Sequence, residues 1–149
     1  MPHDTPISAD DRFYPYTLEI EVTFRDLDAQ GHVNNAVYVT YLETARIKFL
    51  VELLALKGLQ GMPVIMAELN CSYRSPAFFG ERLTVGVGIS RFGIKSFDMA
   101  YRITAGDGRL VAVAKTVQVM YDYAAAQTIP VPDSFKQRVR AYQGDWQAS

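Results

Sequence analysis

A short polar loop in the first third of the chain, DLDAQGHVNN, gathers side chains that could take part in catalysis. It carries Asp26, Asp28, His32, Asn34 and Asn35, and it stands directly before a segment with helical periodicity. The first amides of a helix have no acceptor inside the helix, and the helix dipole adds positive charge there. These amides would stabilise a carbonyl oxygen that gains negative charge during acyl transfer, and Asp28 could act beside them as nucleophile or general base.

The same residues also have ordinary structural uses. Asp, Asn and Gly favour turns, and Asn34 or Asn35 would cap the following helix. His32 on its own is more often a hydrogen-bonded loop residue than a catalytic base. Tyr38 lies within a turn of the loop, but it belongs to an apolar stripe where core packing is the default. From residue types alone, the structural and the catalytic interpretations both stay open.

The segment after the loop predicts a long helix that begins at Asn34 or Asn35 and ends near Gly58. A helix of about 20 residues is roughly 30 Å long and needs a sheet to cover it. Glu43 and Arg46 are three residues apart and would pair on this helix. Apolar residues at spacings of three and four form one wide stripe, made of Tyr38, Tyr41, Leu42, Ala45, Phe49, Leu50 and Leu53.

Period-two patterns predict five strands around this helix. One covers residues 18–24, and four follow the helix as VIMAELNCSYR, LTVGVGISR, KSFDMAYRIT and RLVAVAKTVQVMYDY. Gly86 and Gly88 share one strand face, where we expect the helix to approach closely. The GDG turn at 106–108 predicts a hairpin. The order of elements predicts an α+β domain in which one antiparallel sheet curls around a central helix.

Two features describe the ends of the chain. Asp133 would cap a short C-terminal helix that carries Phe135 and Val139. We expect a flexible arm at residues 1–16, where prolines interrupt any periodicity, and a short tail at residues 143–149. Residues 17–142 then form a single domain.

Composition excludes several classes of protein. The chain has 149 residues, 49% of them hydrophobic, which suits one domain with a sizeable core. Its net charge of -1 provides no overall positive field for nucleic acid. Cys71 is the only cysteine and cannot form an internal disulfide, and with only His3 and His32 it does not make a structural zinc site. We expect no metal and no cofactor.

The sequence also bears on location. The N-terminus has no basic region followed by an apolar stretch, and no run of about 18 apolar residues occurs. We therefore expect a cytoplasmic protein that neither spans nor binds a membrane.

The segment FRDLDAQGHVNNAVYVTYLETAR resembles the signature of hotdog-fold thioesterases of the 4-hydroxybenzoyl-CoA and acyl-acyl-carrier-protein thioesterase type. NCSYRSPAFFGERLTV, SRFGIKSFDMAYRI and GRLVAVAKTVQVMYD are similar to later segments of that family. The resemblance covers roughly residues 17 to 140. It implies the hotdog fold, a curved antiparallel sheet of about five strands wrapped around one long central helix.

The resemblance also implies roles for individual residues. In that family the second aspartate of the D-x-D motif is the catalytic carboxylate, which is Asp28 here, and Asp26 is the lesser candidate. The oxyanion donor is a backbone amide at the helix start, which falls at Asn35, with Ala36 as its neighbour. The His-Val-Asn-Asn string is similar to the acyl-chain branch of the family. The residues expected to border the substrate are Gly31, His32, Val33, Asn34, Ala36 and Tyr38.

These roles predict a thioesterase that hydrolyses acyl-CoA or acyl-carrier-protein thioesters. A thioester carbonyl is electrophilic and its thiolate leaves readily, so hydrolysis needs a carboxylate, an oxyanion site and water. A hotdog dehydratase or hydratase acting on hydroxyacyl or enoyl thioesters is one alternative, since it also sets an acid-base residue against a bound thioester. A non-catalytic acyl-thioester-binding domain is another.

Assembly follows from the edges of the sheet. A sheet curled around one helix keeps edge strands, and unprotected edges tend to pair with another chain. The family resemblance implies a homodimer with its active sites at the interface, and often a homotetramer. We expect the shared edge to be the strand in which Glu68, Asn70, Ser72 and Arg74 alternate with Leu69, Cys71 and Tyr73.

Overall fold

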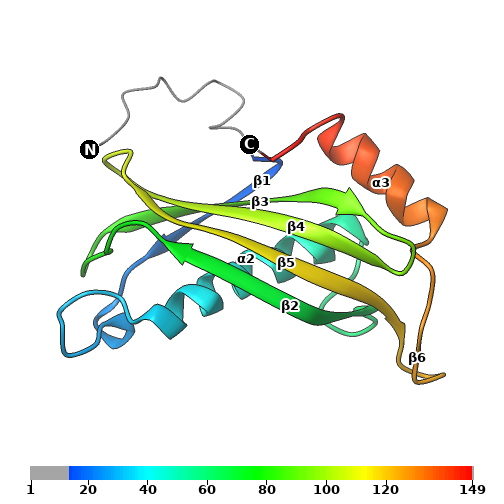
Figure 1. Cartoon of the computed structure of the whole chain (residues 1–149), viewed down its shortest axis with the longest axis horizontal. Helices are drawn as coiled ribbons and strands as arrows, with labels where there is room; N and C mark the ends of the chain where they lie inside the picture. Colours follow the sequence, from blue (N-terminus) through cyan, green and yellow to red (C-terminus); the bar gives the residue numbers. More distant parts are fainter. Residues whose placement is uncertain (1–13, 149) are drawn as a thin grey trace.

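The computed structural model describes residues 14–148. One antiparallel sheet curls around the long helix α2 (Asn35–Leu53), and the shorter helix α3 (Asp133–Gln143) lies at one end (Figure 1). The predicted α+β arrangement of a curved sheet around one long helix is confirmed. The strands are β1 (Tyr16–Glu21), β2 (Val64–Tyr73), β3 (Arg82–Phe92), β4 (Ser96–Ala105), β5 (Leu110–Asp122) and the short β6 (Gln127–Thr128).

The order of strands explains the central position of α2. The sheet runs β1-β3-β4-β5-β2, so β1 and β2 lie at opposite edges, and β6 pairs with the end of β5. In the chain, α2 connects β1 to β2 and therefore has to cross the sheet, which it does on the concave face (Figure 1). All seven residues of the predicted apolar stripe are buried. The crossing also carries the chain from the polar loop to the start of the far edge strand.

The helix ends earlier than the sequence indicated. Its last residue is Leu53, five residues before Gly58, and the backbone amide of Leu54 still donates to the Leu50 carbonyl at 2.9 Å. Ala55 then adopts a left-handed conformation with a φ of 52°, which cannot continue a right-handed helix.

The two strand glycines correct a second prediction. Gly86 and Gly88 face away from α2, whereas their apolar neighbours on β3 face it and are buried. A Cβ atom at Gly86 would lie 2.6 Å from Cγ of Tyr14, and one at Gly88 would collide with the ring of Trp146. The Tyr14 and Trp146 rings pack together with centroids 5.1 Å apart. The close approach to these glycines therefore comes from residues just before β1 and just after α3, and not from α2.

The first strand is also shorter than predicted. β1 ends at Glu21, and Phe24, expected on the strand, lies in a turn of 3-10 helix and is 78% exposed. The backbone amide of Thr23 donates to the Asp26 carboxylate at 2.9 Å, which closes this turn. The chain therefore bends away from the sheet just before the polar loop.

Helix α3 begins at Asp133, but its N-cap is Pro132, so the predicted cap is displaced by one residue. Phe135 and Val139 are buried as predicted. The predicted hairpin at 106–108 joins β4 to β5, with Gly108 at a φ of 87°.

The side chain of Gln143 protects part of a strand edge. β1 pairs with β3 only as far as Val87, which leaves the next part of β3 without a strand beside it. There the Gln143 amide accepts from the Ile89 amide at 3.1 Å and donates to the Ile89 carbonyl at 2.7 Å. One side chain thus replaces a missing strand neighbour, which keeps this edge from pairing elsewhere.

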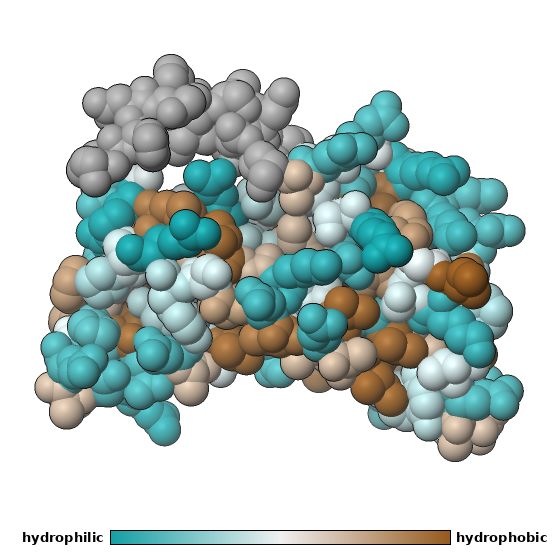
Figure 2. All heavy atoms as spheres, viewed as in Figure 1, coloured by the Kyte–Doolittle hydropathy of each residue, from teal (hydrophilic) through white to brown (hydrophobic). Residues whose placement is uncertain are grey.

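The outer face of the sheet mixes polar and apolar side chains, and apolar atoms gather near its middle (Figure 2). Within residues 14–148, neither helix is long and apolar enough to cross a membrane. Residues 1–13, which make up most of the expected N-terminal arm, and Ser149 lie outside the described residues.

Candidate active site

The polar loop folds back on itself immediately before α2. Leu27 and Val33 form an antiparallel bridge, and the Asp28 amide donates to the His32 carbonyl at 3.1 Å. Gly31 has a φ of 83°, a left-handed conformation that favours glycine, and its amide donates to the Asp28 carbonyl at 3.0 Å. The loop is therefore a closed turn with a fixed shape.

The Asp28 carboxylate is held by two donors from this loop. Its Oδ1 accepts a hydrogen bond from the Gln30 amide at 2.9 Å, and its Oδ2 accepts one from the Asn34 side-chain amide at 3.3 Å. The residue is half-buried. Both oxygens thus have a defined direction, and the carboxylate stays in contact with solvent.

Asn34 also caps the helix. Its Oδ1 accepts from the Ala36 amide at 2.8 Å, and its backbone carbonyl accepts from the Val37 amide at 2.9 Å. Among residues 14–148, no group accepts a hydrogen bond from the Asn35 amide. The first turn of α2 therefore keeps one N–H group for an outside acceptor, at the end where the helix dipole is positive.

Asp26 has a different environment from Asp28. Its Oδ2 accepts from the Tyr41 hydroxyl at 2.7 Å and from the Thr23 amide at 2.9 Å, and its carbonyl accepts from the Asn34 amide at 2.9 Å. Burial, and then the hydrogen bond and charge of Asp26, raise the pKa of Tyr41 far above its ordinary value. Asp26 thus ties the loop to the second turn of the helix.

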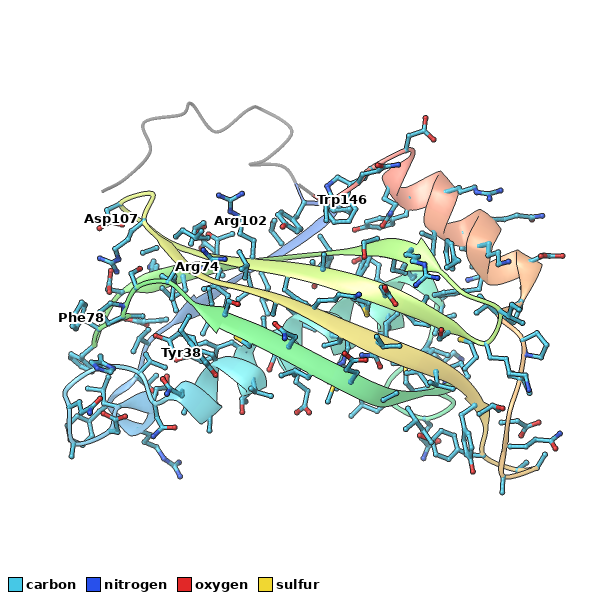
Figure 3. The ribbon with its side chains drawn as sticks, viewed as in Figure 1. Tyr38, Arg74, Phe78, Arg102, Asp107 and Trp146 are labelled. Carbon is cyan, nitrogen blue, oxygen red and sulfur yellow. The ribbon has the colours of Figure 1, made fainter. Side chains whose placement is uncertain are left out.

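A pocket of about 290 Å³ opens beside the start of the helix. The Tyr73 hydroxyl donates to the Asn35 carbonyl at 2.8 Å, and the Tyr38 hydroxyl accepts from the Ala77 amide at 3.1 Å. The two tyrosine rings lie 5.3 Å apart, and Figure 3 shows Tyr38 with Arg74 beyond it at the end of β2. The pocket is lined by His32, Val33, Asn35, Tyr38, Tyr73, Arg74, Ser75 and Pro76.

Half of the residues predicted for the site line this pocket. His32, Val33, Asn35 and Tyr38 do so, and the Nδ1 atom of His32 lies 3.3 Å from the Val33 carbonyl oxygen. The other four are in the loop or the first helical turn but do not line it: Asp28, Gly31, Asn34 and Ala36.

The sequence did not place residues 73–76 beside the helix start of the same chain. They follow β2, which joins the site only because α2 carries the chain across the sheet and β2 then runs back along the far edge. The one signal in the sequence was the alternation of β2, which predicted an edge strand but not its approach to the helix start. Among residues 14–148, no group of three His, Cys, Asp or Glu side chains could hold a metal ion.

Comparisons with known proteins agree with this geometry. The thioesterase-like superfamily matches residues 22–139. The 1,4-dihydroxy-2-naphthoyl-CoA hydrolase of Thermosynechococcus vestitus is 28% identical, over 75% of this chain and 80% of its own. The long-chain acyl-CoA thioesterase FadM of Escherichia coli is 26% identical, over 81% of this chain and 94% of its own.

A solved structure supports the same relationship. A thioesterase from Thermus thermophilus, complexed with coenzyme A and Zn, superposes with a TM-score of 0.81 at 32% identity. The match covers 88% of this chain and 96% of that one. The prediction of a hotdog-fold thioesterase is confirmed, and this chain belongs to the thioesterase-like superfamily.

Proposed function

We propose that this protein hydrolyses acyl-CoA thioesters, with Asp28 as the catalytic carboxylate and the Asn35 backbone amide as the oxyanion donor. The observation that carries the proposal is the amide of Asn35, which has no acceptor among the described residues and belongs to a residue that lines the pocket. The fixed carboxylate of Asp28 lies in the same loop, bonded through Asn34 to the start of the helix. Membership of the thioesterase-like superfamily supports this chemistry.

Asp28 and the Asn35 amide would carry the chemical steps of the reaction. The thioester carbonyl would enter the pocket beside the helix start, and its oxygen would accept a hydrogen bond from Asn35 as negative charge develops. Asp28 would either attack the carbonyl carbon directly or remove a proton from an attacking water molecule. In both routes the carbon–sulfur bond breaks and the thiolate takes up a proton to leave as the CoA thiol. Activated water gives the free acid in the same step, whereas direct attack leaves the acyl group on Asp28 as a mixed anhydride that a water molecule then hydrolyses to the free acid. An acyl-carrier-protein thioester would follow the same steps.

Replacement of Asp28 tests this proposal. Asp28→Asn keeps the size of the side chain and an oxygen for the Gln30 amide, but it removes the negative charge. We expect kcat/KM for thiol release from a panel of acyl-CoAs to fall by at least ~10²-fold. Asp107→Asn, in the exposed β4–β5 turn, is the matched control and should keep the full rate.

Three results would contradict the proposal. A wild-type rate of thiol release by Asp28→Asn would show that the carboxylate has no catalytic role. Hydration of an enoyl-CoA without thiol release would indicate the dehydratase or hydratase alternative. Tight binding of acyl-CoA without any turnover would indicate a non-catalytic binding domain.

The link between Asn34 and Asp28 predicts a specific change in pH dependence. Asn34→Asp keeps a side-chain oxygen for the helix cap, and Asp caps helices as well as Asn does. It replaces the N–H donor 3.3 Å from the carboxylate with a second negative charge. Because two adjacent carboxylates resist ionising together, we expect the acid limb of the kcat/KM profile to move to higher pH. Gln127→Glu adds the same charge on the exposed β6, and an identical profile for both variants would contradict this prediction.

We also propose that two copies join along β2. This strand is one edge of the sheet, and Ile65 and Met66 on it are 40% and 41% exposed. Tyr73, at the end of the same strand, lines the pocket, so a partner on this edge would meet the site and its Asp28 loop. We expect a dimer in sedimentation and a loss of activity as it dissociates on dilution. A fully active species with the mass of one chain would contradict this assembly.

A further inference from the structure

A group of polar side chains lies inside the layer between α2 and the sheet. We call this group the polar floor; its members are Arg46 on α2, Tyr101 on β4, and Thr116 and Gln118 on β5. The four residues are 7%, 1%, 0% and 1% exposed. The neighbouring positions on the concave face are apolar and buried, including Met99 and Phe97. A polar cluster of this kind is costly unless its groups find partners.

The strand side chains of the polar floor are joined by hydrogen bonds. The Tyr101 hydroxyl lies 2.7 Å from the Thr116 hydroxyl, and the Gln118 amide donates to Thr116 at 3.0 Å. Burial raises the pKa of Tyr101, and the positive charge of Arg46 opposes that rise. The three strand side chains therefore form one connected group.

Within the polar floor, the guanidinium of Arg46 lacks a hydrogen-bond acceptor for one of its nitrogen atoms. Arg46 was expected to pair with Glu43 on the helix, and its Nη2 does lie 3.7 Å from the Glu43 carboxylate. That carboxylate side chain is 57% exposed, whereas the Arg46 side chain is 9% exposed. Nη1 is buried and has no acceptor among residues 14–148. A buried guanidinium with an unpaired hydrogen-bond donor lowers the stability of the fold. The presence of Arg46 at this position therefore needs an explanation.

The position of the polar floor suggests that reason. Arg46 lies eleven residues after Asn35 on the same helix, roughly 16 Å along its axis. Long side chains on a helix point back toward its N-terminus, and Nη2 of Arg46 lies 3.7 Å from Glu43, about one turn nearer Asn35, so the guanidinium extends toward the proposed thioester site. An acyl group held at Asn35 and running along the helix would bring its far end to this cluster.

The wall beside the polar floor is the exposed edge strand. In the register of β2 and β5, Leu69 pairs with Thr116 and Met66 pairs with Gln118. Leu69 is half-buried and Met66 is 41% exposed, so two flexible apolar side chains separate the cluster from the open edge. A chain entering between α2 and β2 would displace these side chains and not the backbone.

We propose that the polar floor determines acyl specificity by binding an oxygen acceptor, a hydroxyl or a carboxylate, that the acyl group carries far from the thioester. This inference rests on the proposed thioesterase function. The substrate oxygen would accept a hydrogen bond from the free N–H of Arg46. A carboxylate would also neutralise the positive charge of the guanidinium. A plain alkyl chain of the same length would leave the guanidinium unpaired and place hydrocarbon against it. Sites built to hydrogen-bond a substrate oxygen discriminate strongly against analogues that lack it.

Matched substrates test the proposal. For acyl-CoAs of eight, ten and twelve carbons, kcat/KM is measured with a methyl, a hydroxyl or a carboxylate at the far end. We expect an oxygenated substrate of at least one length to exceed its plain counterpart by at least ~10-fold. Arg46→Met should abolish this ratio while plain acyl-CoAs are still hydrolysed. Arg91→Met, an exposed arginine on β3, is the matched control and should keep the ratio.

A second variant covers the case in which Arg46→Met does not fold. Gln118→Met preserves volume, keeps Arg46, and should lower the ratio severalfold. Equal rates on plain and oxygenated substrates at every length would overturn the inference, as would a preference that survives both replacements. Neither result would affect the proposed function, which is tested separately by acyl-CoA hydrolysis in the wild type and by the Asp28→Asn variant.

Discussion

The side chain of Asn34 is the connection on which the candidate site depends. Its nitrogen donates to the Asp28 carboxylate and its oxygen accepts from the Ala36 amide, so one residue fixes both the acid and the start of the helix. The second bond also occupies the Ala36 amide and leaves the amide of Asn35 for an outside acceptor. A change of this one side chain would therefore alter both the Asp28 carboxylate and the amide of Asn35, which we propose as the oxyanion donor.

The path of α2 makes the rest of the site possible. Because the helix connects opposite edges of the sheet, its N-terminal turn meets the end of β2, and the Tyr73 hydroxyl closes on the Asn35 carbonyl. The same path sets the helix over the concave face, where its apolar stripe packs and where Arg46 is buried. The path of α2 therefore positions both the pocket at the start of the helix and the buried layer between the helix and the sheet.

The sequence predicted the elements with local signals and missed what depends on neighbours far along the chain. Periodicity identified α2 and the strands, and the catalytic roles that the loop motif assigns to Asp28 and Asn35 stay predictions. The role of Tyr73 depends on strand order, which periodicity does not contain. The glycines of β3 were placed correctly in a strand, but Tyr14 and Trp146 cover them, which no local pattern indicates. The spacing of Arg46 and Glu43 predicted their pairing but not the burial of the arginine.

The central claim is that the Asn35 amide stabilises the oxyanion, and removing that single N–H tests it most directly. Replacing Asn35 with its α-hydroxy acid analogue turns the amide into an ester and keeps the side chain. We expect kcat on an acyl-CoA to fall by about 10²- to 10³-fold with little change in KM. The same replacement at Thr40, on the exposed side of α2, should leave kcat near the wild-type value. A wild-type kcat for the Asn35 ester would contradict the account.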